Sequence, residues 1–198
     1  MRRIGLTGGI ATGKSHLRAR FENLGIPTID SDVLAREALA PRSAGLAAVA
    51  ERFGRKVLKG DGSLDRDGLA KIVFADPEAR KDLEAIVHPY VQRRTDEWFA
   101  GLDTSRYRYA IADIPLLFEV GRDKDFDEVI VVACTPETQL KRLLERGMTE
   151  PEARQRLTAQ LPLEDKIARA DHVIRTDGSY DETERQVQEL HTRLSGSA

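Results

Sequence analysis

A glycine-rich segment near the N-terminus has the residue types and the spacing of a phosphate-binding loop. Residues 8–15 read Gly-Gly-Ile-Ala-Thr-Gly-Lys-Ser and match the pattern GxxxxGK(S/T) in full. Glycines let backbone N–H groups curl around phosphate oxygens, Lys14 can neutralise the β and γ phosphates of a nucleotide, and the hydroxyl of Ser15 can coordinate Mg²⁺. This segment therefore predicts a nucleoside triphosphate site.

The residues around this loop argue against several other nucleotide-binding classes. No GxGxxG pattern is present, so the fingerprint of a dinucleotide-binding fold is missing. No Asn-Lys-x-Asp tetrapeptide occurs, which weakens a switch-type GTPase. Asp113 is followed by Ile114 and Pro115, not by the glutamate of many motor and transport ATPases. Small kinases become the leading class, because they need an acceptor-binding insertion and an arginine-bearing lid, and the chain has candidates for both.

Carboxylates follow two of the expected strands. Asp30 and Asp32 come at the end of the second strand, and Asp113 ends the third. The carboxyl ends of parallel strands form the ligand crevice of open α/β folds. A carboxylate there can take or orient the proton of an attacking hydroxyl, and Asp113 can hold a Mg²⁺-bound water or orient substrate. Capping of the next helix is the alternative for Asp30 and, less so, for Asp32, and capping of a loop is the alternative for Asp113.

Two arginines and one histidine could also take part. Arg142 and Arg146 are four residues apart and project from one side of an expected helix. Their guanidinium groups could contact the transferring phosphates from a lid, and a solvated helix face is the alternative, more so for Arg146. His88 precedes Pro89 at an expected corner between two helices, where the commoner role of the imidazole is structural.

Short β-rich runs alternate with longer helical patterns, which is typical of a parallel α/β sheet. The runs that we expect to form strands are Arg3–Thr7, Ile26–Ile29, Tyr107–Asp113, Glu128–Cys134 and His172–Thr176. Thr135 and Pro136 begin a helix that Gly147 can end, and capping boxes begin two more helices at Thr149 and at Ser179.

The stretch between Ile29 and Tyr107 is far longer than a crossover helix requires. We expect an inserted helical region with helices over Asp67–Ala75, Pro77–His88 and Pro89–Gly101. The chain is then one domain, 1–198. Residues 1–32 and 105–198 form its nucleotide-binding core, residues 33–104 its insertion and residues 140–160 its lid.

The composition fits one globular protein. There are 198 residues, with 31 Lys and Arg against 33 Asp and Glu and a formal net charge of −2, which argues against a dedicated nucleic-acid binder. The longest apolar run, Val129 to Cys134, is far below the roughly 20 residues of a membrane-spanning helix. The apolar residues before Gly8 are too few for a signal peptide, and Cys134 is the single cysteine, expected in a buried strand. We expect a cytoplasmic protein.

Taken in order, these motifs resemble the dephospho-CoA kinase family over nearly the whole chain. The resemblance is carried by Gly-Leu-Thr-Gly-Gly-Ile from Gly5, the phosphate loop, Ile-Asp-Ser-Asp with Ala35-Arg36, Val-His-Pro from Val87, Asp113–Glu119, Gln139-Leu-Lys-Arg-Leu and Ala170-Asp171. The loop alone identifies only a superfamily, whereas its combination with the segments around Asp32, His88 and Asp113 is specific.

The resemblance implies a fold and a reaction. The implied fold is a P-loop kinase fold of α/β class, with a five-stranded parallel sheet flanked by helices, a helical CoA-binding insertion and a lid. The implied reaction is ATP-dependent phosphorylation of the ribose 3′-hydroxyl of dephospho-CoA, the last step of coenzyme A biosynthesis, with Mg²⁺ as cofactor. No nucleic acid, membrane or obligate protein partner is implied.

The resemblance also implies residue roles. Asp32 falls on the family's proposed general base, Arg142 on a lid arginine, and residues 174–178 on a segment that contacts adenine. The expected catalytic residues are Lys14, Asp32 and Arg142. The remaining expected contacts are Gly9, Ile10, Ala11, Thr12, Gly13, Lys14, Ser15, His16 and Arg142 for ATP; Thr7, Asp32, Arg36, His88 and Asp113 for the acceptor; and Ser15 and, through water, Asp113 for Mg²⁺.

Three residues depart from the family's pattern: Ala11 stands where glycine is frequent, His16 where threonine is usual, and Thr176 where asparagine is common. Two other functions remain open at this stage. A kinase for another nucleoside or small alcohol would prefer a different acceptor in a panel, and a non-catalytic phosphate-loop module would bind ATP without turnover.

Overall fold

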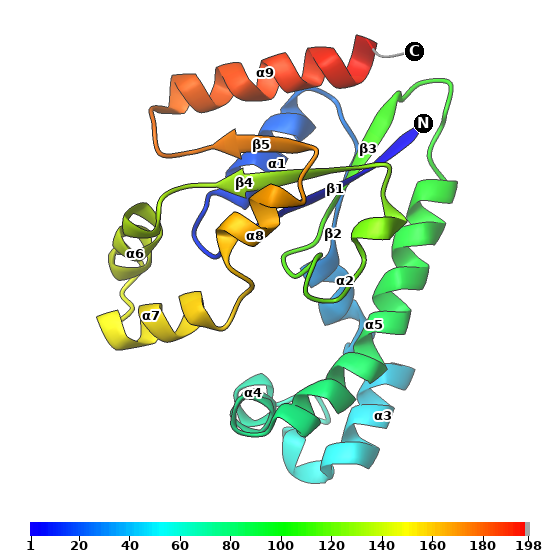
Figure 1. The fold of residues 1–198 in the computed structure, drawn as a ribbon. Coiled ribbons are helices and arrows are strands. Elements are labelled where there is room, and N and C mark those ends of the chain that lie inside the picture. Colours follow the sequence, from blue (N-terminus) through cyan, green and yellow to red (C-terminus); the bar gives the residue numbers. More distant parts are fainter. Residues whose placement is uncertain (197–198) are drawn as a thin grey trace. The chain divides into compact units, whose positions relative to one another are not determined.

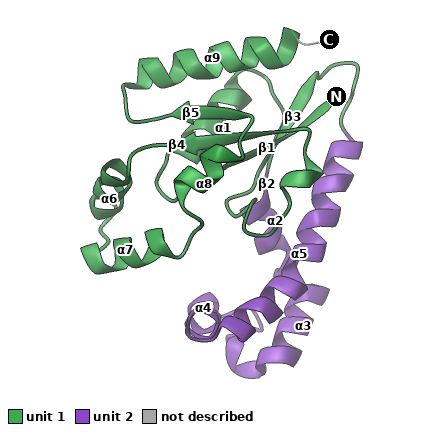
Figure 2. Ribbon diagram, in the orientation of Figure 1, with its two compact units in different colours: residues 1–29, 102–198 green, residues 30–101 purple. Residues whose placement is uncertain are grey.

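The computed structural model describes residues 1–196 and separates into two compact units. The first unit combines residues 1–29 with the chain from Leu102 onward, and the second is Asp30–Gly101 (Figure 2). The break points lie about three residues before the insertion limits expected from the sequence.

Unit 1 is built on a five-stranded sheet with the order β2-β3-β1-β4-β5 (Figure 1). Its strands are β1 (Arg2–Gly8), β2 (Thr28–Asp30), β3 (Tyr109–Asp113), β4 (Glu128–Ala133) and β5 (His172–Arg175). Strand β1 pairs in parallel with both β3 and β4, and β4 pairs in parallel with β5. The predicted parallel α/β sheet is confirmed, and each run of the sequence analysis contains its strand to within one residue at either end.

Two helices bury one face of this sheet. Leu17 and Phe21 of α1 (Lys14–Asn23) and Val187 of α9 (Tyr180–Gly196) join a core cluster with residues of β1, β3, β4 and β5. These side chains are fully buried, each worth roughly 1.5–3 kcal/mol in transfer free energy. Strand β1 and helix α1, which flank the phosphate loop, are therefore both part of the core of unit 1.

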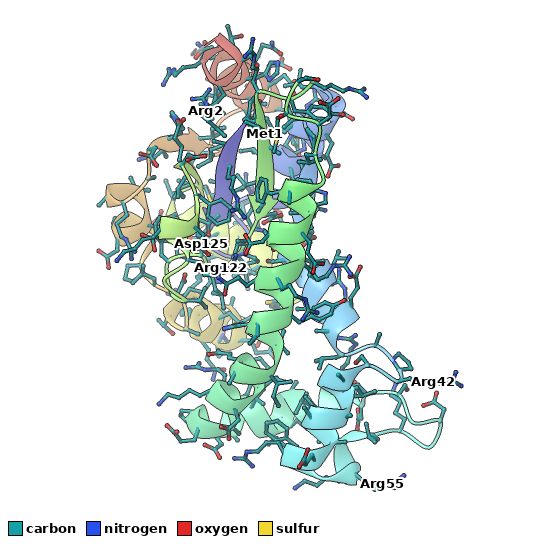
Figure 3. All side chains as sticks on the ribbon, turned by 90° about the vertical axis from the view of Figure 1, so that its right-hand side faces the viewer. Met1, Arg2, Arg42, Arg55, Arg122 and Asp125 are labelled. Carbon is teal, nitrogen blue, oxygen red and sulfur yellow. The ribbon has the colours of Figure 1, made fainter. Side chains whose placement is uncertain are left out.

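Further helices of unit 1 follow β4: α6 (Pro136–Glu145), α7 (Glu150–Thr158) and α8 (Leu163–Ala168). The hydroxyl of Thr135 caps α6 by accepting from the N–H of Thr138, and the predicted capping box of Thr149 with Glu152 begins α7. Before β4, a short turn of 3₁₀ helix, η2 (Asp123–Asp125), is closed by Arg122, whose Nε donates to Asp125 at 2.8 Å. Both residues are labelled in Figure 3.

Unit 2 is helical, as expected. It contains α2 (Ser31–Ala38), α3 (Ala44–Phe53), the 3₁₀ turn η1 (Arg55–Val57), α4 (Arg66–Ala75) and α5 (Pro77–Ala100). Side chains cap each of its four α-helices: Asp30 begins α2, Ser43 begins α3, Asp65 begins α4 and Asp76 begins α5.

Helix α5 corrects one expectation. We expected two helices meeting at His88 and Pro89, whereas a single helix runs through both residues. Proline lacks an N–H and costs about 3 kcal/mol inside a helix. The helix continues because Val87 and Val91, on either side of the proline, are buried and α5 contacts α2, α3 and α4. Tertiary burial thus overrides the local helix-breaking signal.

Two further expectations concern exposure. Cys134, directly after β4, is buried. No helix within residues 1–196 combines the length and the apolar character needed to cross a membrane.

Candidate active site

The phosphate loop connects β1 to α1 in the conformation that its glycines allow. Gly13 precedes the first residue of α1 with a φ of 92°, in the left-handed region that favours glycine. At Gly8, a Cβ atom would lie 2.5 Å from the carbonyl oxygen of Val132, so a side chain would collide with β4. Both glycines are required by the backbone path, whatever the loop binds.

Ala11, which departs from the family's frequent glycine, also has a positive φ, of 61°. An L-residue in this conformation costs about 1–2 kcal/mol. Its methyl group is buried in a cluster with Leu143 of α6 and Ala153 of α7. This burial offsets part of the backbone cost, which explains how alanine is accepted in the loop.

Lys14 faces the carboxylate that ends β3. Its ammonium group donates to Oδ1 of Asp113, and Nη1 of Arg18 lies 3.9 Å from Oδ2. Asp113 is 2% exposed, so its charge is removed from bulk water and balanced by two cations. The structure thus brings together Lys14 and Asp113, two residues that the sequence placed in the site.

Ser15 follows Lys14 in the first turn of α1. It is exposed, and its hydroxyl has no hydrogen-bond partner among the described residues. No group of three or more His, Cys, Asp or Glu side chains within residues 1–196 could hold a metal ion by itself. Mg²⁺ that enters with a nucleotide takes most of its ligands from phosphates and water, so one hydroxyl can suffice, and the role of Ser15 as its ligand stays a prediction.

Arg142 on α6 is held between the loop and the segment after β5. Its Nη1 donates to the carbonyl oxygen of Ala11 at 3.2 Å and to Oγ1 of Thr176 at 3.0 Å, and its Nη2 donates to the carbonyl oxygen of Thr176 at 2.6 Å. Arg146 is exposed, and its guanidinium makes no hydrogen bond or ion pair with the part of the chain described. A role of Arg142 as a lid arginine stays a prediction.

The segment expected to contact adenine is anchored beside the loop. The hydroxyl of Thr176, where the family commonly has asparagine, donates to the carbonyl oxygen of Thr12 at 2.6 Å. Oδ1 of Asp177 accepts from the N–H of Thr135 at 2.6 Å. Burial of the Asp177 carboxyl raises its pKa, but hydrogen bonds from Thr135 and Thr138 outweigh this and hold the pKa below its ordinary value. An ionised, well-bonded Asp177 stabilises the turn that follows β5.

Two other expected contact residues in unit 1 differ in burial, since His16 is exposed and Thr7 is buried. The ring of His16 meets that of Tyr180 edge to face, with centroids 5.3 Å apart. Thr7 is fully buried, and its hydroxyl donates to the carbonyl oxygen of Pro115 at 3.1 Å. As the structure stands, Thr7 supports the segment after β3, and its contact with an acceptor stays a prediction.

The side chains of Asp30 and Asp32, both in unit 2, have different hydrogen-bonding environments. Oδ1 of Asp30 accepts from the N–H of Asp32 at 2.8 Å, which makes Asp30 the cap of α2. The carboxylate of Asp32 is exposed, and no described residue donates to it. Asp32 is therefore exposed while Asp30 caps the helix, and contact of Asp32 with a substrate stays a prediction.

The remaining expected acceptor residues also lie in unit 2. Arg36 lines a pocket of about 500 Å³ together with Lys59, Arg66, the carboxylates of Asp65 and Asp67, and apolar residues that include Leu39. His88 is exposed on α5, and its imidazole makes no hydrogen bond within residues 1–196. The structural role expected for His88 at a helix corner is therefore wrong, since neither the corner nor a partner is found.

Sequence reasoning missed two glutamines that contact the loop. Gln139 donates from Nε2 to the carbonyl oxygen of Ile10, and Oε1 of Gln160 accepts from the N–H of Ile10. Gln139 could have been suspected, because it lies three residues before Arg142 on the same helix face. Gln160 has no local signal, since its partner is far away in the sequence.

A parallel sheet whose first strand leads into a phosphate loop and a helix, with Lys14 paired to a buried carboxylate on the adjacent strand, defines a P-loop protein of the nucleoside-kinase class. The sequence model of the family "Dephospho-CoA kinase" matches residues 2–182. The chain belongs to the dephospho-CoA kinase family.

Individual relatives agree with this assignment. A dephospho-CoA kinase of Synechococcus sp. is 48% identical over 191 residues, covering 96% of this chain and 95% of the relative. The dephospho-CoA kinase structure from Campylobacter jejuni superposes with a TM-score of 0.74 at 30% identity, covering 98% of this chain and 96% of that one. The crystal structure of TT1252 from Thermus thermophilus gives a TM-score of 0.84 at 35% identity and covers 98% of both chains.

Proposed function

We propose that this chain transfers the γ-phosphoryl group of ATP to the ribose 3′-hydroxyl of dephospho-CoA, giving coenzyme A and ADP. The single observation that carries the proposal is the Lys14 and Asp113 pair beside a fully formed phosphate loop in a member of this family. Lys14 neutralises charge on the nucleotide's outer phosphates as the phosphoryl group moves.

Asp32 is the proposed general base for this transfer. Its carboxylate is exposed and has no donor among the described residues, so it is free to accept a hydrogen bond from an acceptor hydroxyl. Transfer is direct from ATP to the hydroxyl and requires no covalent enzyme intermediate. Arg142 is proposed to stabilise the phosphates, and lid closure over residues 140–160 to exclude water that would hydrolyse ATP.

Mg²⁺ is the proposed cofactor. Ser15 would hold it through its hydroxyl, and Asp113 through a water molecule, because the carboxylate oxygens of Asp113 already face Lys14 and Arg18. When bound with ATP, the ion neutralises phosphate charge and keeps most of its own ligands as water and phosphate oxygens.

The acceptor is proposed to bind the helical insertion, residues 33–104. The pocket that Arg36 shares with Lys59 and Arg66 supports this proposal. These three basic side chains outnumber Asp65 and Asp67 in its lining and stand next to apolar ones, which suits a diphosphate joined to a long organic arm. A cytoplasmic location, without nucleic-acid or obligate protein partners, is proposed from the balanced charge and the single cysteine.

An acceptor panel with labelled ATP tests the proposal. We expect label transfer to dephospho-CoA and little transfer to adenosine, AMP or pantothenate. Preference for one of the other acceptors would assign a different small-molecule kinase, and ATP binding without any transfer would leave a non-catalytic module. Omitting Mg²⁺ from the same assay tests the cofactor.

A further inference from the structure

The backbone of Ile10, inside the phosphate loop, is held from both sides by side chains. Nε2 of Gln139 donates to the Ile10 carbonyl oxygen at 2.7 Å, and the Ile10 N–H donates to Oε1 of Gln160 at 2.8 Å. A backbone carbonyl can only accept and a backbone N–H can only donate, so the two side-chain amides must present opposite groups. Gln139 is a donor and Gln160 an acceptor.

Gln139 is part of a row of donors along the loop. The carbonyl oxygen of Ile10 is bonded by Gln139, that of Ala11 by Arg142, and that of Thr12 by Thr176. Three consecutive carbonyl groups are thus satisfied by side chains from outside the loop. Carbonyl groups held in this way cannot turn toward a bound phosphate, which requires N–H donors and is repelled by carbonyl oxygens.

The backbone of the phosphate loop passes close to the side-chain amide of Gln139. The side chain of Gln139 is buried, with 5% exposed, and a Cβ atom on Gly9 would lie 2.6 Å from its Nε2. A side chain at Gly9 would therefore displace this amide from its hydrogen bond to Ile10. Ala11, next in the loop, has a positive φ, and a strained residue persists only where its surroundings hold it.

Gln160 connects the segment after α7 to the same loop. The next residue, Leu161, donates its N–H to Oε1 of Glu119 at 3.2 Å, and that oxygen lies 2.7 Å from the ammonium group of Lys166. Lys166 has no exposed surface. The end of the proposed lid is therefore tied both to the loop and to Glu119, whose ion-pair partner Lys166 is buried.

We propose that Gln139 and Gln160 are positioning residues, which hold Ile10 so that the phosphate loop keeps its nucleotide-binding conformation. The inference rests on the proposed function only in taking ATP as the phosphoryl donor. Neither side chain needs to touch the nucleotide, because both act through the loop backbone.

The same substitution at the two positions has opposite expected effects. Gln139→Glu replaces the donor by a carboxylate that repels the Ile10 carbonyl, and we expect kcat/KM for ATP to fall roughly ten- to a hundred-fold. Gln160→Glu keeps an acceptor oxygen for the Ile10 N–H, and we expect kcat/KM for ATP within about two- to threefold of the wild type. Both variants add one negative charge near the loop, so each controls for the charge of the other.

Neutral variants separate hydrogen bonding from charge. Gln139→Met and Gln160→Met each lose the bond without adding charge, and both should raise KM for ATP while KM for dephospho-CoA stays near the wild-type value. Calorimetric titration of the full chain with MgADP reads the same effect without an acceptor. Failure of the wild type to use dephospho-CoA would therefore overturn the proposed acceptor and leave this test intact.

Two results would overturn the inference. Equal losses in Gln139→Glu and Gln160→Glu would show a charge effect, not opposite hydrogen-bonding roles. Lower melting temperatures with unchanged ADP affinity and an unchanged KM for ATP would show a purely structural role. If the Gln139 variants do not fold, the comparison of Gln160→Glu with Gln160→Met decides, since equal ADP affinity in that pair contradicts the proposal.

Discussion

The ammonium group of Lys14, in the phosphate loop, donates to a carboxylate oxygen of Asp113 at the end of β3. The side chain of Lys14 is 15% exposed and that of Asp113 is 3% exposed, so the pair is largely removed from water. Asp113 therefore holds Lys14 in place before any nucleotide binds. The phosphate oxygens of a nucleotide would have to compete with this carboxylate for the Lys14 ammonium group. Arg18, at 3.9 Å from Asp113, would still partly balance the charge of the carboxylate when Lys14 turns to the phosphates.

Lys14→Ala should abolish turnover, with kcat reduced at least about 10²-fold, because no cation then follows the migrating charge. It should also destabilise the fold by up to about 3 kcal/mol, because a buried carboxylate loses its partner. Adding Asp113→Asn should restore much of the stability but none of the activity. Steady-state kinetics and urea unfolding of the single and double variants check both effects. Near wild-type kcat in folded Lys14→Ala would show that the phosphate-loop assignment is wrong.

Arg142→Ala should lower kcat and raise KM for ATP together. The guanidinium bonds the Ala11 carbonyl and both oxygens of Thr176, so its loss loosens the loop as well as removing a charge near the phosphates. Arg146→Ala is the matched control, since Arg146 is on the same helix end and is exposed. Kinetics at saturating and limiting ATP make the comparison. A fall in kcat with unchanged KM would limit Arg142 to charge stabilisation, and a larger effect of Arg146→Ala would move the lid role there.

The elements of this fold were predictable where local physics decides them. Continuous apolar runs identified β3 and β4, and the Thr149 and Glu152 capping box located the start of α7. The phosphate loop was recognisable because its backbone needs glycine locally, at Gly13 for a positive φ and at Gly8 for the close approach of β4. Pro89 led to the wrong prediction of two helices, because the burial of Val87 and Val91 in tertiary contacts outweighed the local helix-breaking signal.

The support of the loop was not predictable from local signals. Gln160 meets Ile10 at a sequence separation of 150 residues, and Thr176 meets Thr12 at a separation of 164. Such pairings depend on how the strands are ordered in the sheet, which local periodicity does not contain. The sequence left open whether Asp30 caps the following helix; its bond to the Asp32 N–H shows the cap, and the catalytic roles of the two aspartates stay predictions.

The pH dependence of stability should include a contribution from Glu128. Burial of its carboxyl raises the pKa, but hydrogen bonds from His172 at 2.5 Å and Arg2 at 2.6 Å outweigh burial and hold the pKa below its ordinary value. Because the pKa of Glu128 is lower in the folded state than in the unfolded state, its ionised carboxylate stabilises the fold at pH values above the unfolded-state pKa. This stabilisation is lost as the pH falls through the folded-state pKa.

Glu128→Gln removes this contribution. We expect the variant to be less stable than the wild type at pH 7 and the difference to shrink as pH falls below about 4.3, the ordinary glutamate value. Urea unfolding across this pH range measures it, with exposed Glu51→Gln as the control. A stability difference that does not change with pH would mean that packing, not ionisation, causes the effect.

The sharpest prediction compares the two aspartates near the start of α2. Asp32→Asn keeps the shape of the side chain and removes its charge, and general-base assistance is typically worth about 10² to 10⁴ in rate. We therefore expect kcat to fall by that factor while KM for ATP stays within a few-fold. Asp30→Asn is the matched control, because asparagine caps a helix about as well as aspartate does, and its stability should change by about 1 kcal/mol or less with a smaller loss of rate. Steady-state kinetics with dephospho-CoA and thermal unfolding of both variants give the answer. A catalytically dead Asp30→Asn beside a nearly normal Asp32→Asn would reverse the two roles, and it would mean that the carboxylate bonded to the N–H of Asp32 is the one that leaves this contact to meet the substrate.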